Sequence, residues 1–126
     1  MILSLDMDSD IPIYLQLQEQ IIIAIGNGSL KSGEILPTVR QLSADLGINP
    51  MTVSKAYQVL KNDGYLTSNR RDGTKVRDVL DIHLDISDRT QLEVLLAKGY
   101  LAAEDKEQFK QSVNLILDSL DQHRKE

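Results

Sequence analysis

The amino-acid sequence predicts a mainly helical protein that carries one small β-hairpin. Apolar residues recur at helical spacing in five stretches, most of them bounded by Pro, Gly or small polar residues. One further stretch, near residues 65–79, alternates apolar and polar residues around an Asp-Gly pair, as a hairpin does. The hydrophobic share of 41% allows a globular core to form within 126 residues. We therefore expect one helical domain with a hairpin, followed by a short helical segment.

The first helix is expected within SDIPIYLQLQEQIIIAIGNG, at residues 9–28. Its apolar positions 14, 17, 21 and 25 share one helix face. We expect Asp10 to cap this helix, Pro12 to lie in its first turn and Gly26 to stop it. The stretch that follows contains Ile35-Leu36, which can form a brief strand.

Two further helices are separated by a single glycine. The second helix begins at a Thr-x-x-Gln capping box, Thr38 to Gln41, and ends at Gly47, which suits a left-handed turn. Asn49 can cap the third helix, and Pro50 takes its favoured first position. The face of the third helix that would pack in the core carries Val53, Ala56, Tyr57 and Leu60. Two helices joined by a glycine turn, over about residues 38–62, form a helix-turn-helix.

A hairpin is expected directly after the third helix. Tyr65–Ser68 and Thr74–Val79 show strand-like alternation, and the residues between them include Asp72-Gly73, a strong hairpin signal. Three basic residues surround the expected tip: Arg70, Arg71 and Lys75. Three helices followed by a basic hairpin describe a winged helix-turn-helix domain. We place that domain at residues 11–79 and its wing at about residues 65–79.

The charge of the chain is unevenly distributed. The net charge is −5, yet residues 11–79 hold eight Lys/Arg and six Asp/Glu, which gives +2. Residues 1–10 carry −3 and residues 80–126 carry −4. A nucleic-acid-binding surface is indicated by where the basic residues lie, more than by the net charge of the chain. The acidic flanks therefore do not exclude DNA as a partner.

The start of the third helix carries side chains that suit a DNA groove. Asn49, Thr52 and Ser54 are short and can bond to base edges or phosphates, and the Met51 side chain can meet a thymine methyl group. The N–H groups at the helix start attract phosphate. Lys55 lies one turn further on and would reach the sugar-phosphate backbone. The sequence therefore predicts a helix that reads the major groove.

Three stretches of residues 11–79 carry a family resemblance: PIYLQLQEQI, SGEILPTVRQLSADLGINPMTVSKAYQVLKNDGYL and DGTKV. They resemble the DNA-binding domain of the GntR family of bacterial transcription regulators. The Pro-Ile-Tyr opening and the Asn-Pro-x-Thr-Val-x-x-Ala-Tyr run are similar to its compact YtrA-type branch. The resemblance implies that Arg40 binds phosphate and that residues 49–54 contact bases. The family wing commonly reads Gly-x-Gly-Thr-aromatic-Val and enters the minor groove, whereas here Arg71 replaces the first glycine and Lys75 the aromatic residue.

These arguments give one set of candidate DNA-contacting residues: Thr38, Arg40, Asn49, Pro50, Met51, Thr52, Ser54, Lys55, Arg70, Arg71, Gly73 and Lys75. The basic members have structural alternatives, a solvated helix surface for Arg40 and Lys55 and an ordinary polar turn for Arg70-Arg71. His83 and His123 stand apart from any spaced set of metal ligands, and no catalytic set is visible. We therefore expect no enzyme activity, no metal and no cofactor.

Residues 80–126 are expected to form two amphipathic helices. The first, in DISDRTQLEVLLAKG, is expected to be capped by Ser87 or Asp88 and to stop at Gly99. The second carries an apolar stripe of Phe109, Val113, Ile116, Leu117 and Leu120. Roughly forty residues cannot enclose a drug-sized pocket, and two such helices cannot bury both of their faces internally. We expect them to form a dimerisation segment; the alternative is that they fold back on their own domain.

The features together predict a sequence-specific DNA-binding transcriptional regulator, a repressor that acts as a homodimer on a pseudo-palindromic operator. The YtrA-type resemblance implies control of a nearby transporter operon, often an ABC exporter. The alternative is a winged helix that binds another protein and no specific DNA. No basic n-region opens the chain, and its longest apolar run, Ile21–Ile25, is too short to cross a membrane, so we expect a cytoplasmic protein. The sequence assigns no small-molecule effector.

Overall fold

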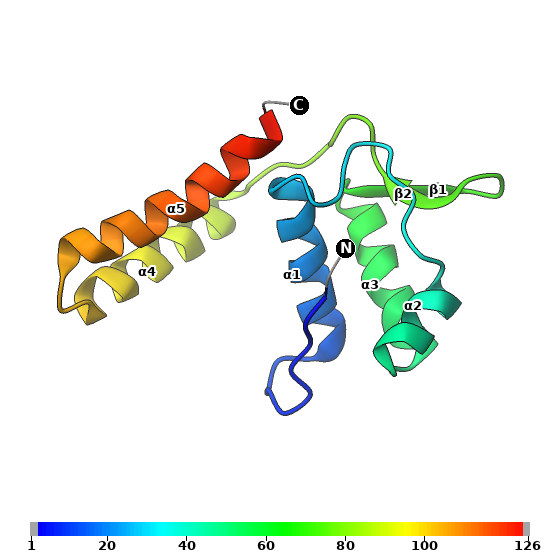
Figure 1. Ribbon diagram of the computed structural model, residues 1–126, viewed down its shortest axis with the longest axis horizontal. Helices are drawn as coiled ribbons and strands as arrows, with labels where there is room; N and C mark the ends of the chain where they lie inside the picture. The colour runs from blue at the N-terminus through cyan, green and yellow to red at the C-terminus, as the bar shows by residue number, and fades with distance from the viewer. Residues whose placement is uncertain (1–2, 125–126) are drawn as a thin grey trace. The chain divides into compact units, whose positions relative to one another are not determined.

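A computed structural model describes the backbone of residues 3–124 and the side chains of residues 3–121 (Figure 1). The helices and strands follow one another along the chain as α1 (Ile13–Gly26), α2 (Val39–Leu46), α3 (Pro50–Asn62), β1 (Leu66–Asn69), β2 (Gly73–Val76), α4 (Ile86–Ala102) and α5 (Lys106–Arg124). The chain divides into two compact units, one ending at Ile82 and one beginning at His83. The predicted fold class, mainly helical with one hairpin, is confirmed. No helix of the described residues is long and apolar enough to cross a membrane.

The first unit has its core between α1 and α3, which lie side by side in Figure 1. Leu17 and Ile21 of α1 and Val53 and Leu60 of α3 are each fully buried. The hairpin adds Leu66 and Val76, and α2 adds Leu42. Aliphatic side chains therefore supply most of this core, and α3 is held by it along one face.

The start of α1 differs from the prediction. Asp10 does not cap the helix: Pro12 occupies the N-cap position, and no side chain bonds to the first-turn N–H groups there. Asp10 lies two residues before the N-cap, too early for its carboxylate to act as the cap. The preceding chain is held instead by the side chain of Gln16, which accepts from the Asp6 N–H (2.8 Å) and donates to the carbonyl oxygens of Asp6 (3.0 Å) and Ile11 (2.9 Å).

The predicted boundary between α2 and α3 is confirmed. The Thr38 hydroxyl oxygen accepts from the Gln41 N–H (3.0 Å), and the Gln41 side chain accepts from the Thr38 N–H (2.9 Å), which is the predicted capping box. Gly47 ends α2 with a φ of 68°, in the left-handed region. The Asn49 side-chain oxygen caps α3 by accepting from the Met51 N–H (2.8 Å), and Pro50 opens the helix.

The wing is an antiparallel hairpin whose strands pair Leu66 with Val76 and Asn69 with Gly73. The brief strand expected at Ile35-Leu36 is present as a bridge between Ile35 and Lys75, so the wing has a third, short neighbour. The second strand ends at Val76 and not at Val79 as predicted. It cannot continue because the chain bends at residues 78–79, where the Arg77 Nε donates to the Val79 carbonyl oxygen (3.2 Å).

In the second unit, α4 begins earlier than predicted. Asp85 is the N-cap, in place of Ser87 or Asp88. Its carboxylate accepts from the Asp88 N–H (2.8 Å), while the Asp88 carboxylate accepts from the Asp85 N–H (3.0 Å). Asp88 is thus the second half of a capping box, and its negative charge lies in the first turn, where the helix dipole favours it.

The second difference in this unit is that α4 does not stop at Gly99 but continues to Ala102. A Cβ atom built on Gly99 would lie 2.4 Å from Cε2 and 2.5 Å from Cζ of Phe109. Gly99 therefore allows the Phe109 ring of α5 to approach the backbone of α4, and it is not a helix-ending glycine. Lys106 closes the end of α4 by donating to the carbonyl oxygens of Tyr100 (2.5 Å) and Ala103 (2.7 Å).

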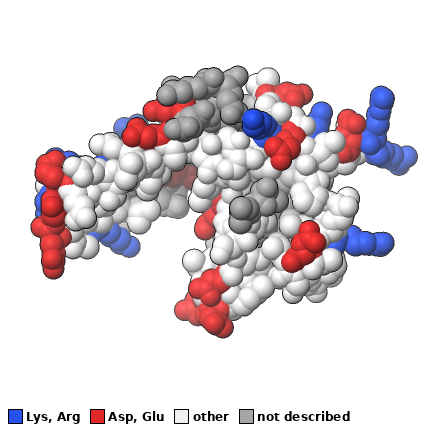
Figure 2. Space-filling model, in the orientation of Figure 1, with Lys and Arg blue, Asp and Glu red and all other residues white. Residues whose placement is uncertain are grey.

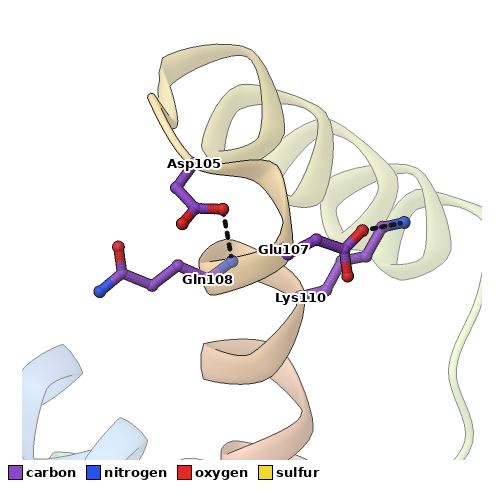
Figure 3. A network of polar contacts seen from close by, with 4 residues as sticks. All are labelled: Asp105, Glu107, Gln108 and Lys110. Atoms are coloured by element: carbon purple, nitrogen blue, oxygen red, sulfur yellow. Dashed lines mark hydrogen bonds and ion pairs between the residues drawn. The ribbon is translucent and has the colours of Figure 1, made fainter.

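The start of α5 is fixed by local polar contacts (Figure 3). The Asp105 carboxylate accepts from the Gln108 N–H (3.1 Å), as an N-cap side chain does. One turn along, Lys110 lies 3.4 Å from the carboxylate of Glu107. Both partners of this pair are well exposed, so the pair contributes little to stability.

Candidate nucleic-acid interface

The leading end of α3 is open to solvent. Met51 exposes 78% of its surface, and Asn49, Pro50 and Ser54 are exposed as well. Thr52 is half-buried. The capping bond uses the Asn49 carboxamide oxygen, so its amide group keeps its donors. The structure therefore gathers the short polar side chains predicted to read bases at one exposed helix end.

Lys55 lies one turn into α3 and contacts α1. Its Nζ is 3.7 Å from the centre of the Tyr14 ring, within the range of a cation–π contact. Tyr14 itself is half-buried and packs against the core. The sequence analysis did not predict this contact, because the spacing of apolar residues within each helix does not show which side chains of two different helices meet. It ties the recognition helix to α1 and gives Lys55 a structural role beside its predicted one.

Arg40 lies on the exposed surface of α2. Among the described residues its guanidinium forms no ion pair, and only its carbonyl oxygen is engaged, by the Ser43 hydroxyl (3.0 Å). Thr38, two residues earlier, uses its hydroxyl oxygen in the capping box. Arg40 is thus available for a partner outside the chain, whereas Thr38 already has a structural task.

The tip of the wing is held by Asn69. Its side-chain oxygen accepts from the N–H groups of Arg71 (2.9 Å) and Asp72 (2.6 Å), and Gly73 completes the turn with a φ of 78°. This local bonding leaves the side chains of Arg70 and Arg71 exposed. Figure 2 shows basic side chains projecting from this end of the hairpin.

Lys75 is placed less prominently than the sequence suggested. It is half-buried in β2, where it pairs with Thr67 and bridges to Ile35. The loop before α1, with Asp6, Asp8 and Asp10, forms a separate acidic surface in Figure 2. Acidic residues of the first unit are not confined to that loop: Asp72 is exposed next to Arg71 at the wing tip, and Figure 2 shows acidic side chains beside basic ones at this end of the hairpin.

The hydroxyl of Tyr57 links the two helices of the helix-turn-helix. It donates to the carbonyl oxygen of Pro37 (2.7 Å), directly before the Thr38 cap of α2. The side chain is 2% exposed, and burial raises the pKa of Tyr57 well above its usual value. The neutral phenol is thus held in place, and it fixes α2 against α3.

The predicted dimer stripe lies on α5 and is divided by exposure. Phe109 and Val113 are half-buried and line a groove with Leu96 and Tyr100 of α4. The Phe109 and Tyr100 rings meet edge to face, with centroids 6.5 Å apart. The rest of the stripe faces solvent: Ile116 at 64%, Leu117 at 53% and Leu120 at 39%.

Within the described part of the chain, no group of three or more His, Asp or Glu side chains is placed to hold a metal ion. The side chain of His123 lies outside the described residues. The groups predicted to contact DNA at the α3 end, at Arg40 and at the wing tip all belong to the first unit.

A glycine turn between two helices, an exposed polar end on the second helix and a basic two-stranded wing define a winged helix-turn-helix DNA-binding protein. The family described as "Bacterial regulatory proteins, gntR family" matches residues 13–76, which is half of the chain. The chain belongs to the GntR family and is a DNA-binding transcriptional regulator.

Its relatives include the HTH-type transcriptional repressor YtrA of Bacillus subtilis, which is 37% identical over 76 residues, 60% of this chain and 58% of YtrA. The HTH-type transcriptional regulator GgaR of Escherichia coli is 36% identical over 73 residues, 58% of this chain. That match spans only 29% of GgaR. The similarity to these relatives thus concerns the DNA-binding unit.

Two solved structures extend the similarity along the chain. A transcriptional antiterminator from Listeria monocytogenes EGD-e has a TM-score of 0.75 and 28% identity, over 95% of this chain and 93% of that one. YtrA from Sulfolobus acidocaldarius, a GntR-family transcription factor, has a TM-score of 0.56 and 32% identity, over 94% and 99%. Both alignments extend beyond residues 13–76, so they include much of the second unit.

Proposed function

We propose that this protein is a homodimeric repressor that binds a pseudo-palindromic operator. The observation that carries the proposal is the combination, in one chain, of an open recognition-helix end with a second unit that leaves its apolar surface uncovered. None of the described residues of α4 is buried, and Leu95 and Leu101 expose 68% and 78% of their surfaces. A surface of this kind indicates an interface.

We assign the DNA contacts to three places in the first unit. The end of α3, from Asn49 to Ser54, contacts base edges in the major groove. Arg40 binds a phosphate, which agrees with its exposure and its lack of an ion-pair partner among the described residues. Arg70 and Arg71 contact the DNA backbone or the minor groove through the wing. Lys55 adds a phosphate contact only if its ammonium leaves the Tyr14 ring.

We assign the dimer contact to α4 and the exposed part of the α5 stripe, Ile116, Leu117 and Leu120. A single winged helix touches one half-site, and the +2 charge of residues 11–79 gives only modest attraction to DNA. A dimer supplies the second contact at high effective concentration if its recognition helices are about 34 Å apart, one turn of DNA. The functional division is thus residues 11–79 for DNA and 80–126 for dimerisation.

The regulated genes follow only from similarity. Because YtrA of Bacillus subtilis is described as a repressor, we propose repression here, with a transporter operon as the target and the cytoplasm as the place of action. The described residues of the second unit form two helices, and none of the α4 residues is buried, so we assign no effector and no cofactor to this unit. A panel of sugars and organic acids should give no tight one-per-subunit binding in calorimetry.

The decisive experiment selects DNA fragments from the source genome with the full-length protein and measures their binding at several salt concentrations. An operator should emerge as two inverted half-sites, and its affinity should fall steeply with salt, because phosphate contacts release counterions. Recovery of fragments without a shared inverted sequence would contradict the proposal. It would favour a winged helix that binds another protein.

A further inference from the structure

The chain that leaves the wing passes directly over the end of the recognition helix. Gly64 follows the last turn of α3, is buried and has a φ of 94°. A Cβ atom built on Gly64 would lie 2.0 Å from the carbonyl oxygen of Asp81 and 2.8 Å from its carbonyl carbon. Contacts this short to backbone atoms cannot be relieved by turning a side chain. No residue other than glycine therefore fits at position 64 while residue 81 stays where it is.

Hydrogen bonds hold the two segments together at this point. The Asp81 N–H donates to the Gly64 carbonyl oxygen (3.3 Å), and the Arg77 N–H donates to the Tyr65 carbonyl oxygen (3.0 Å). On its other side, the Gly64 N–H donates to the carbonyl oxygen of Lys61 in α3 (3.2 Å). The backbone of residues 64–65 thus bonds both to the recognition helix and to the segment that leads toward the second unit.

We propose that this contact between Gly64 and Asp81, here called the latch, fixes where the connection to the second unit leaves the recognition helix, and so determines the half-site spacing that the dimer accepts. Gly64 acts as a positioning residue and touches no DNA. The proposal rests on the homodimer proposed above, because spacing matters only when two recognition helices bind together.

Chain length shows why the latch matters. Beyond Asp81, only residues 82–85 precede α4, which begins at Ile86. Four residues extend at most about 13–14 Å, at about 3.3–3.6 Å each. With the latch open, the Ser32 hydroxyl would still donate to the Asp78 carbonyl oxygen (2.9 Å). The free connection would therefore contain residues 79–85 and extend at most about 23–25 Å. Opening the latch would add about 10 Å of reach, about three times the roughly 3.4 Å by which one base pair advances a half-site along the DNA. The longer connection would therefore accept several spacings that the latched one rejects.

The test uses the full-length protein with Gly64→Asn and a matched control, Gly47→Asn. Both glycines have positive φ, and Asn tolerates such a backbone better than other residues. A Cβ atom on Gly47 would meet nothing within 4 Å, so the control carries the backbone cost without the collision. Fluorescence anisotropy would measure binding to one half-site and to paired half-sites at the selected spacing, and at spacings one and two base pairs longer or shorter.

The wild type and Gly47→Asn should lose about tenfold or more in affinity when the spacing changes by one base pair. For Gly64→Asn we expect half-site affinity to stay within about twofold and the spacing penalty to drop below about threefold. A Gly64→Asn protein that keeps the full spacing penalty would overturn the latch. A wild type that binds paired half-sites no better than one would instead overturn the dimer, so the two failures are distinguishable.

A second variant covers the case in which Gly64→Asn does not fold, as judged by circular dichroism. Inserting Gly-Gly-Ser-Gly after Ile82 leaves the latch intact and lengthens the free connection to about the same reach as an open latch. The insertion should relax the spacing penalty in the same way. An insertion variant that remains as selective for spacing as the wild type would show that the connection does not set the spacing, and the proposal would fall.

Discussion

Asn49 and Thr38 each have a role in folding that is separate from the DNA contact proposed for them. Each uses one side-chain oxygen to cap a helix, and each keeps a donor that the cap does not use: the amide N–H groups of Asn49 and the hydroxyl of Thr38. Replacing Asn49 with Ala would therefore cost about 1 kcal/mol of stability through the lost cap, besides any lost base contact. A binding defect at either residue can be interpreted only when the stability of the variant is measured beside it.

Tyr57 gives a prediction that separates a hydrogen bond from packing. Tyr57→Phe keeps the ring in the core but leaves the Pro37 carbonyl oxygen without its donor, so the free energy of unfolding should fall by about 1–3 kcal/mol at neutral pH. Because the pKa of Tyr57 is raised on folding, its contribution is full below about pH 10, the unfolded value, and is lost as the pH rises above it. Urea unfolding should show the gap between wild type and Tyr57→Phe narrowing above that pH. A constant gap would contradict the pKa argument.

Arg40 and Arg71 give a prediction about the two kinds of DNA contact. Arg40→Ala and Arg71→Ala should each weaken binding to operator and unrelated DNA alike, and each should reduce the salt slope by about one unit, because one phosphate contact is lost. Thr52→Val should instead cost about 1–3 kcal/mol at the operator alone. Affinities measured from low to moderate salt check both. An unchanged salt slope in Arg40→Ala would remove its phosphate role.

At the scale of secondary-structure elements, the sequence predicted correctly those features that depend on residues close together in the chain. The capping box at Thr38, the left-handed Gly47 and the buried face of α3 depend on residues within one or two turns, and all three are confirmed. The prediction for Gly99 was wrong because a helix-ending glycine and a close-packed glycine look alike in sequence. Only the position of Phe109, ten residues later, distinguishes them. The cation–π pair of Lys55 and Tyr14 was likewise beyond a sequence argument, since it joins two helices.

At Gly99 we predict that a Gly→Ala substitution lowers stability, although in most helices it raises it. In an open helix interior, Gly→Ala stabilises by about 1 kcal/mol. Here Gly99→Ala should destabilise the second unit by about 1–3 kcal/mol, because the new methyl group collides with the Phe109 ring. In a Phe109→Ala background the same change should become neutral or stabilising. Thermal unfolding of the four proteins of this double-mutant cycle checks it, and additive effects would contradict the close contact.

At the scale of the whole molecule, the two units are stabilised differently. The buried apolar residues found in the described chain lie between Leu17 and Val76, within the first unit. The second unit has contacts between α4 and α5 but no buried residue in α4. The first unit thus has a core of its own, whereas the second leaves most of its apolar residues exposed, which is why we propose a partner surface for it. Family membership and fold could be inferred from sequence because the first unit carries both. The proposed interface could be predicted only as a stripe, since the spacing of apolar residues shows which face is apolar and does not show what covers it.

The last prediction tests, through the oligomeric state, whether the exposed apolar residues of α5 hold the proposed dimer together. Leu117→Asp with Leu120→Asp should give a folded but monomeric protein, because charges replace exposed apolar groups that lie apart from the Phe109 contact. Operator affinity should fall by about a hundredfold or more, while affinity for one half-site should stay nearly unchanged. A matched variant, Gln111→Asp with Ser112→Asp, adds the same charge to exposed polar positions of α5 and should remain dimeric. Sedimentation and operator binding would be measured together. A double Leu→Asp protein that sediments as a monomer yet binds the full operator as tightly as the wild type would show that dimerisation is not what gives this regulator its affinity.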